Sequence, residues 1–237
     1  MWFGSRSNLR KLACTDLSLT VDDDVIKRVT VVRDLGVLVD AEFTMKHHIS
    51  RVVSNCFFQL RRLRQIRRSV GEEVTKRLVT ALILIRLNYC NAVVAGLPQS
   101  TLQPPQRVHN AAALLVSDTK PRDHISPVLA QLHWLPVNQC ITYKLHLVNV
   151  KHCPDYLNNL VHLTTDSATR PDLRSATRLL YRKPALGSKF SERAFSCAGL
   201  AAWNNLPDHI QSITNTASFK RQLKTFLFSA CSYYWTV

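Results

Sequence analysis

Glycine is scarce in this 237-residue chain, which has only six. Neither G-x-x-x-x-G-K-[ST] nor G-x-G-x-x-G occurs, so the sequence gives no support to a glycine-rich loop that holds nucleotide phosphates. The seven cysteines are scattered without a C-x-x-C pair, and their odd number does not suggest a disulfide framework. We therefore expect an intracellular protein of the nucleus or cytoplasm.

Long apolar runs are also missing. The longest, residues 78–85, is interrupted by Thr80 and flanked by Arg77 and Arg86, and it is far too short to span a bilayer. The first residues contain no apolar run of the kind that forms a signal peptide. We expect no membrane partner.

Acidic residues are outnumbered: 16 Asp and Glu oppose 31 Lys and Arg, which gives a formal net charge of +15. This excess favours a polyanionic partner, with nucleic acid ahead of an anionic membrane surface. Between Glu42 and Glu72 there is no acid at all. A charge run is often only a solvated face, but here the cations would repel one another without a counter-charge, so we predict that they contact phosphates. These candidate nucleic-acid-binding residues are Lys46, Arg51, Arg61, Arg62, Arg64, Arg67 and Arg68.

Hydrophobic patterning predicts a mainly α fold (α+β) with a short antiparallel β segment at the N-terminus. Apolar residues alternate with polar ones over residues 17–21, and apolar runs resume at 29–32 and 35–39. Beyond Met45 they recur every three or four positions, as in amphipathic helices. We therefore expect three parts. These are a β-rich part (1–42), a helical bundle (43–118) and a mostly helical extension (119–237).

The bundle pattern predicts three helices. The first has Thr44 as its N-cap and runs to about Arg68. The second spans residues 72–91, with two acids in its first turn, and the third follows Pro104-Pro105. In the extension we predict helices over residues 125–133, 137–151, 191–205 and 218–229, and a short strand over 179–181.

Two clusters contain metal-binding residue types, but neither has a convincing pattern. The triplet Asp22–Asp24 could hold Mg²⁺, although an acidic turn between strands is the far commoner arrangement. Cys140, His146, His152 and Cys153 follow a C-x5-H-x5-H-C spacing that matches no structural zinc pattern. The sequence therefore predicts no catalytic residue and no metal site.

A second basic set lies in a polar, loop-like region of the extension. It is the other candidate for contact with phosphates, on charge alone. Its members are Arg170, Arg174, Arg178, Arg182, Lys183 and Lys189.

Many short strings, taken in order along the chain, carry a family resemblance. The first are Arg33-Asp34-Leu35-Gly36-Val37-Leu38-Val39-Asp40 and His48-Ile49. Within the bundle they are Leu60-Arg61-Arg62-Leu63-Arg64, Arg86-Leu87-Asn88-Tyr89-Cys90-Asn91, Gly96-Leu97-Pro98 and Gln106-Arg107-Val108-His109-Asn110-Ala111-Ala112-Ala113. In the extension they are His133-Trp134-Leu135-Pro136-Val137, Arg193-Ala194-Phe195-Ser196, Trp203-Asn204-Asn205-Leu206-Pro207 and Ser218-Phe219-Lys220-Arg221-Gln222-Leu223-Lys224-Thr225. Together they resemble the segment after the catalytic palm in reverse transcriptases of LINE-type (non-LTR) retrotransposons, in the CR1/L2-like branch.

This resemblance implies the C-terminal part of an RNA-directed DNA polymerase: the end of the palm, a helical thumb and a C-terminal extension. The family's catalytic aspartates lie in a [YF]-A-D-D motif, which does not occur in this chain. We therefore expect no enzyme activity from the chain alone and no cofactor in this fragment, because the Mg²⁺ of the full-length polymerase is held by those aspartates.

The resemblance also implies the partners. The thumb helix over residues 51–68 would contact the backbone of RNA, DNA or an RNA–DNA heteroduplex, largely without sequence preference. The upstream palm and fingers would be its protein partners, and no small-molecule substrate is expected. The alternative is an inert or domesticated protein-interaction module derived from the same element.

Overall fold

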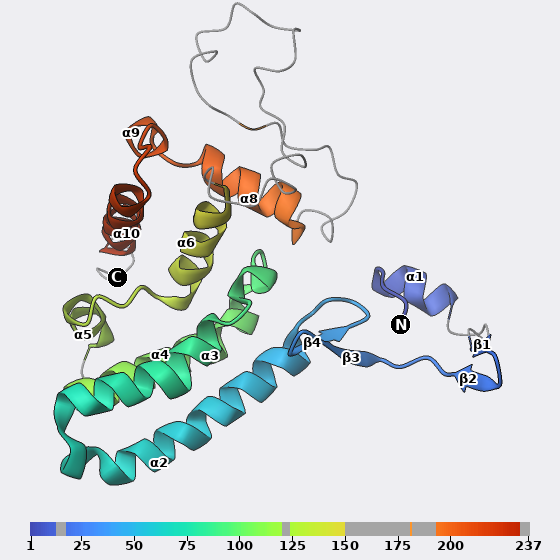
Figure 1. Cartoon of the computed structure of the whole chain (residues 1–237), viewed down its shortest axis with the longest axis horizontal. Helices are drawn as coiled ribbons and strands as arrows, with labels where there is room; N and C mark the ends of the chain where they lie inside the picture. The colour runs from blue at the N-terminus through green and yellow to red at the C-terminus, as the bar shows by residue number, and fades with distance from the viewer. Residues whose placement is uncertain (13–17, 120–123, 150–180, 182–192, 233–237) are drawn as a thin grey trace, which may run out of the picture.

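The computed structural model describes residues 1–12, 18–119, 124–149, 181 and 193–232. Over these residues the fold is mainly helical, with two small antiparallel sheets near the N-terminus, as the hydrophobic pattern predicts (Figure 1). The second basic set lies outside the described residues, as do His152, Cys153 and all but Tyr181 of the strand predicted over 179–181.

A short helix and two hairpins form the N-terminal part. In the first hairpin Asp22 and Asp23 make the turn, as predicted, with Asp22 at a φ of 54°. The second hairpin corrects the predicted strand over residues 35–39: Leu35 and Gly36 form a two-residue turn with φ values of 44° and 83°. Positive φ at both positions matches the right-handed twist of the strands. The elements are α1 (Arg6–Lys11), β1 (Leu19–Val21), β2 (Asp24–Ile26), β3 (Val31–Asp34) and β4 (Val37–Asp40).

Helix α2 (Lys46–Val79) is interrupted at Gly71, and its two arms run in opposite directions (Figure 1). Gly71 has a φ of 72° and a ψ of 178°, a conformation almost confined to glycine. The two arms correspond to the first two predicted helices. The second arm continues through a π-helical turn, η1 (Thr80–Leu84), into α3 (Ile85–Asn88).

The predicted N-cap Thr44 is wrong by one residue. Met45 occupies that position, with a φ of 59° and no side-chain cap, and the helix begins at Lys46. The Thr44 hydroxyl nevertheless accepts a hydrogen bond from the Lys46 amide at 3.4 Å. The carboxylate of Asp40, rather than Thr44 alone, organises this turn, and its contacts are described below.

The third bundle helix, α4 (Gln99–Ser117), starts before Pro104 and Pro105 rather than after them. The Pro98 carbonyl accepts from the Thr101 and Leu102 amides at 2.9 and 3.3 Å, and the Leu102 side chain is buried. Tertiary burial of this first turn therefore outweighs the tendency of proline to begin a helix. A 3-10 turn, η2 (Asn91–Val94), connects α3 to α4.

The remaining predicted helices are present in the described part, but α8 begins at Phe195 rather than near 191, and α10 begins at Thr216 rather than at 218. Helix α6 begins directly after Pro136, as predicted, and the Gln106 side chain caps it by accepting from the Val137 amide at 2.8 Å. The sequence reasoning did not predict the short helix α9. The bounds are α5 (Ile125–Gln131), α6 (Val137–Asn149), α8 (Phe195–Asn204), α9 (Asp208–Gln211) and α10 (Thr216–Ser232).

Three clusters of buried apolar side chains form the interior of the described part. The bundle core joins α2, α4 and α5, the central core joins β4, the start of α2 and α6, and the C-terminal core joins α8, α9 and α10. Helix α6 contributes to the last two. The bundle core crosses residue 118, since Val128 and Leu129 of α5 pack with Val108 and Val116 of α4. Each such side chain contributes about 1.5–3 kcal/mol by burial.

Candidate nucleic-acid interface

The first arm of α2 separates apolar and basic side chains between two faces. Ile49, Cys56, Leu60 and Leu63 are buried against the bundle. At 100° per residue, Arg51, Arg61, Arg62 and Arg68 point away from this apolar stripe, whereas Lys46 and Arg64 lie at its edge and are still exposed. The exposed cations, which we call the basic face, are Lys46, Arg51, Arg61, Arg62, Arg64 and Arg68.

No carboxylate in the described part of the chain forms an ion pair with the basic face. Among the described residues there are two ion pairs between side chains, Arg6–Glu42 at 3.2 Å and Arg77–Glu73 at 3.1 Å, and neither includes these cations. Arg62 lies over the ring of Phe58, 5.8 Å from its centroid, which leaves its charge in place. The cations on the arm therefore repel one another, and a bound anionic partner would reduce that electrostatic repulsion.

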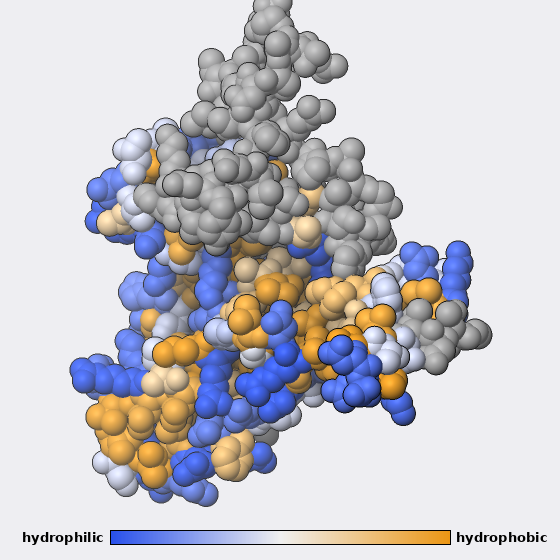
Figure 2. All heavy atoms as spheres, turned by 45° about the vertical axis from the view of Figure 1, so that its right-hand side comes forward, coloured by the Kyte–Doolittle hydropathy of each residue, from blue (hydrophilic) through white to orange (hydrophobic). Residues whose placement is uncertain are grey.

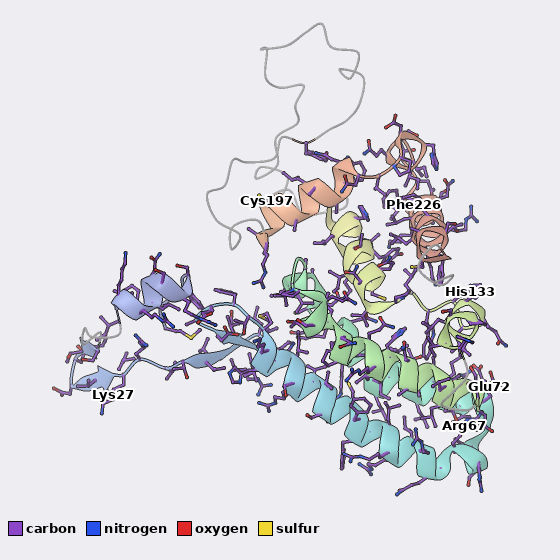
Figure 3. All side chains as sticks on the ribbon, turned by 180° about the vertical axis from the view of Figure 1, so that it is seen from behind. Lys27, Arg67, Glu72, His133, Cys197 and Phe226 are labelled. Carbon is purple, nitrogen blue, oxygen red and sulfur yellow. The ribbon has the colours of Figure 1, made fainter. Side chains whose placement is uncertain are left out.

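Arg67 departs from the other predicted site residues because its guanidinium is already used inside the protein. Its Nε and one terminal nitrogen donate to the carbonyl oxygens of Leu115 and Val116, at 3.0 and 2.9 Å. It lies beside the turn between the two arms (Figure 3). A cation at the C-terminal carbonyls of a helix is favoured by hydrogen bonding and by the helix dipole. We assign Arg67 to the packing of α2 on α4.

The hydrophilic side chains do not cover the surface evenly. Figure 2 shows an apolar area at the end of the molecule where α2 reverses direction, beside clusters of hydrophilic side chains. Ile66 and Val74, on either side of the turn, are 42% and 46% exposed. Exposed apolar side chains thus lie beside the cations at the end of the arm.

Strand β3 and helix α3 meet the start of α2 around a cavity of about 380 Å³. Arg33 of β3, Arg51 of α2 and Arg86 of α3 line it, so each element supplies one guanidinium. The sequence reasoning did not select Arg33 or Arg86. Both occur inside strings that carry the family resemblance, but they lie far apart in the sequence and outside the acid-free stretch, so charge counting did not connect them.

Two hydrogen bonds hold the β3–β4 hairpin against the helices that form this cavity. The Tyr89 hydroxyl donates to the Leu35 carbonyl at 2.6 Å, and the Leu38 amide donates to Nδ1 of His48 at 3.4 Å. Burial lowers the pKa of His48, so the imidazole is neutral at pH 7 and its proton lies on Nε2. The hairpin that carries Arg33 is therefore fixed relative to α2 and α3.

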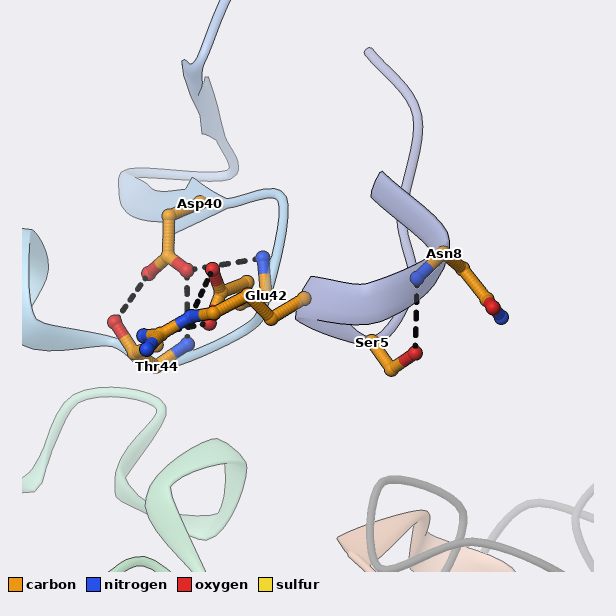
Figure 4. Close-up of polar contacts among 6 residues, drawn as sticks. Ser5, Asn8, Asp40, Glu42 and Thr44 are labelled. Atoms are coloured by element: carbon orange, nitrogen blue, oxygen red, sulfur yellow. Dashed lines mark hydrogen bonds and ion pairs between the residues drawn. The ribbon is translucent and has the colours of Figure 1, made fainter. Parts of the chain in front are cut away.

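Asp40 organises the turn from β4 into α2 (Figure 4). Its carboxylate accepts from the amides of Glu42, Thr44 and Met45 at 3.1, 2.9 and 3.0 Å, and from the Thr44 hydroxyl at 3.0 Å. Burial would raise the pKa of Asp40, but these hydrogen bonds outweigh it, and the pKa is lowered. The carboxylate thus fixes the backbone between β4 and the start of the first arm of α2.

The described residues contain no group of three or more His, Cys, Asp or Glu side chains placed to hold a metal ion. Of the residues considered for zinc, Cys140 and His146 lie on α6, and their spacing of six directs them to different faces of the helix. Burial raises the pKa of the Cys140 thiol to about 11 and lowers that of His146 to about 4. Of the acidic triplet, Asp22 and Asp23 form the turn of the first hairpin and Asp24 is the first residue of β2.

No family model matches the chain, and comparisons with curated proteins and with solved structures return no match either. No helix in the described part has the length and apolar character needed to cross a membrane.

Proposed function

We propose that the chain binds a nucleic-acid duplex through phosphate contacts of the basic face, as the thumb-containing C-terminal part of a LINE-type reverse transcriptase. The observation that carries this proposal is a run of exposed cations on one helical arm that no carboxylate of the described part neutralises. Phosphates spaced along a duplex complement such a row. The ordered strings of the family resemblance support RNA–DNA heteroduplex as the ligand.

The polymerase reaction itself is not part of this proposal. Two-metal chemistry needs converging carboxylates, and the family motif that supplies them does not occur in the sequence. The chain would bind the duplex, and the palm and fingers of the parent polymerase would catalyse the reaction.

Binding to a short RNA–DNA heteroduplex, titrated across salt concentration, tests the proposal. We expect the affinity of the wild type to fall steeply with salt, because each phosphate contact releases condensed counterions. A variant with Arg61, Arg62, Arg64 and Arg68 changed to Gln should lose affinity and about three units of the slope of log K against log salt. Equal slopes in the two proteins would rule out the basic face as the binding surface.

A matched control removes the same charge elsewhere. Arg10, Lys11, Lys220 and Arg221 are exposed on α1 and α10, away from the arm. Their replacement by Gln changes the net charge by the same amount. We expect this control to keep most of the slope, whereas an equal loss in both variants would indicate attraction by net charge alone.

A protein-interaction module derived from the same element is the second candidate function. It is favoured by the first hairpin, whose strands are exposed throughout: Leu19, Val21, Val25 and Ile26 are each more than half exposed. Exposed apolar strands are typical of surfaces that pair with another chain. A wild type that shows no salt-dependent affinity for heteroduplex would favour this candidate.

A further inference from the structure

The cavity between the β3–β4 hairpin, α2 and α3 carries positive charge that no described carboxylate compensates. Arg33, Arg51 and Arg86 line it, and no Asp or Glu is among its lining residues. None of the three arginines forms an ion pair with another described residue. Three guanidiniums around one hollow repel one another, and a bound anion would relieve that repulsion.

The lining residues other than the three arginines could contact the uncharged part of a small organic anion. Val52, Ile85 and Tyr89 supply apolar and aromatic surface, and Asn55 and His48 supply further polar groups. A volume of about 380 Å³ lies within the range of small-molecule sites, which combine apolar walls with a few polar groups. The cavity therefore has room for more than an isolated ion.

We infer that this cavity binds a phosphate monoester that carries a nucleoside, either the 5′-phosphorylated end of a nucleic-acid strand or a free nucleoside monophosphate. A monoester carries close to two negative charges and offers three oxygens to guanidinium forks, whereas an internal diester carries one charge. A terminal group can enter a hollow, but an internal diester needs space for the strand on both sides. The strand-end form of this inference rests on the proposed nucleic-acid binding, and the mononucleotide form does not.

Fluorescence anisotropy with two otherwise identical short strands tests this inference. One strand carries a 5′-phosphate and the other a 5′-hydroxyl, and the measurements are made at about 150 mM salt, where long-range attraction is screened. In parallel, calorimetry compares adenosine monophosphate with adenosine. The variant R33Q/R86Q removes two cavity charges, and the matched control R61Q/R68Q removes two charges from the basic face outside the cavity.

We expect the wild type to bind the phosphorylated strand about tenfold more tightly than the hydroxyl strand. R33Q/R86Q should lose this preference. R61Q/R68Q should weaken both strands alike and keep the preference. Stronger binding of the mononucleotide than of the strand end would identify a free nucleotide as the ligand, and the reverse order would identify a strand end; both support the inference.

Two results would overturn the inference. One is equal binding of both strands by the wild type together with no preference for adenosine monophosphate over adenosine. The other is a phosphate preference that persists in R33Q/R86Q, with circular dichroism showing that the variant is folded. If neither strand binds but the mononucleotide binds and needs Arg33 and Arg86, the ligand of the cavity is a free nucleotide, and the heteroduplex titration described above tests the proposed duplex binding separately.

Discussion

Arg67 donates from its guanidinium to the carbonyl oxygen of Val116 at 2.9 Å, across 49 positions of sequence. This contact joins the basic arm of α2 to the end of α4, the partner helix in the bundle core. The same side-chain type thus has two roles on one helix. The exposed arginines are available to a ligand, and Arg67 holds the arm in place.

Arg67→Gln should lower the free energy of unfolding by about 1–3 kcal/mol, because two charge-assisted hydrogen bonds to helix-terminal carbonyls are lost. Urea unfolding measures the change. Arg68→Gln is the matched control, since Arg68 is exposed, and it should change stability by less than about 0.5 kcal/mol. In heteroduplex binding the order should reverse, with the larger loss in the Arg68 variant.

Asp40→Asn should destabilise the protein by about 1–3 kcal/mol at pH 7, because an amide nitrogen cannot accept the hydrogen bonds that the carboxylate accepts. The folded-state pKa of Asp40 lies below its unfolded value near 3.9, so its contribution is present above that pH and is lost as pH falls through the lower folded pKa. The variant should therefore lack this part of the acid transition. Asp23→Asn, in an exposed turn, is the control and should leave stability at pH 7 almost unchanged.

The buried histidines His109 and His146 should make the fold sensitive to mild acid. Burial lowers the pKa of each to about 4, against about 6.5 in the unfolded chain. Below pH 6.5 these histidines bind protons in the unfolded state but stay neutral in the folded state. The free energy of unfolding therefore falls between pH 6.5 and 4, by on the order of 3 kcal/mol for each histidine.

Chemical denaturation across this pH range measures the effect. His109→Gln and His146→Gln should each flatten the pH dependence, whatever they cost in packing at pH 7. His209→Gln, at an exposed position of α9, is the control for the loss of one histidine and should leave stability at pH 7 almost unchanged. A slope that is equally steep in all three variants would show that other groups bind the protons.

Gly71→Ala should cost about 1–3 kcal/mol through the backbone alone. A Cβ at this position would meet no atom within 4 Å, so packing does not oppose the substitution, but the φ of 72° with ψ of 178° does. Gly4→Ala is the control, because Gly4 has no such φ and its nearest contact, 3.7 Å, is ordinary. Thermal unfolding compares the two, and equal melting temperatures would show that the turn accepts a side chain.

Local sequence determined much of the secondary structure. The spacing of Ile49, Cys56 and Leu60 defines the buried face of α2, because helical periodicity depends only on neighbours in the chain. The acidic turn of the first hairpin is equally local. Where such signals were overruled, as at the start of α4, burial of Leu102 supplied an energy that no local pattern contains.

For the candidate site, the sequence by itself determined that positive charge gathers on one stretch without acids. Only the tertiary structure decided which cations are free: Arg67 contacts carbonyls 48 and 49 positions away, while Arg33 and Arg86 join Arg51 around one cavity. The physical reason is that the charge of a side chain is fixed by its residue type. Whether that charge is hydrogen-bonded inside the protein or lies beside other charges depends on which surfaces the hydrophobic cores bring together.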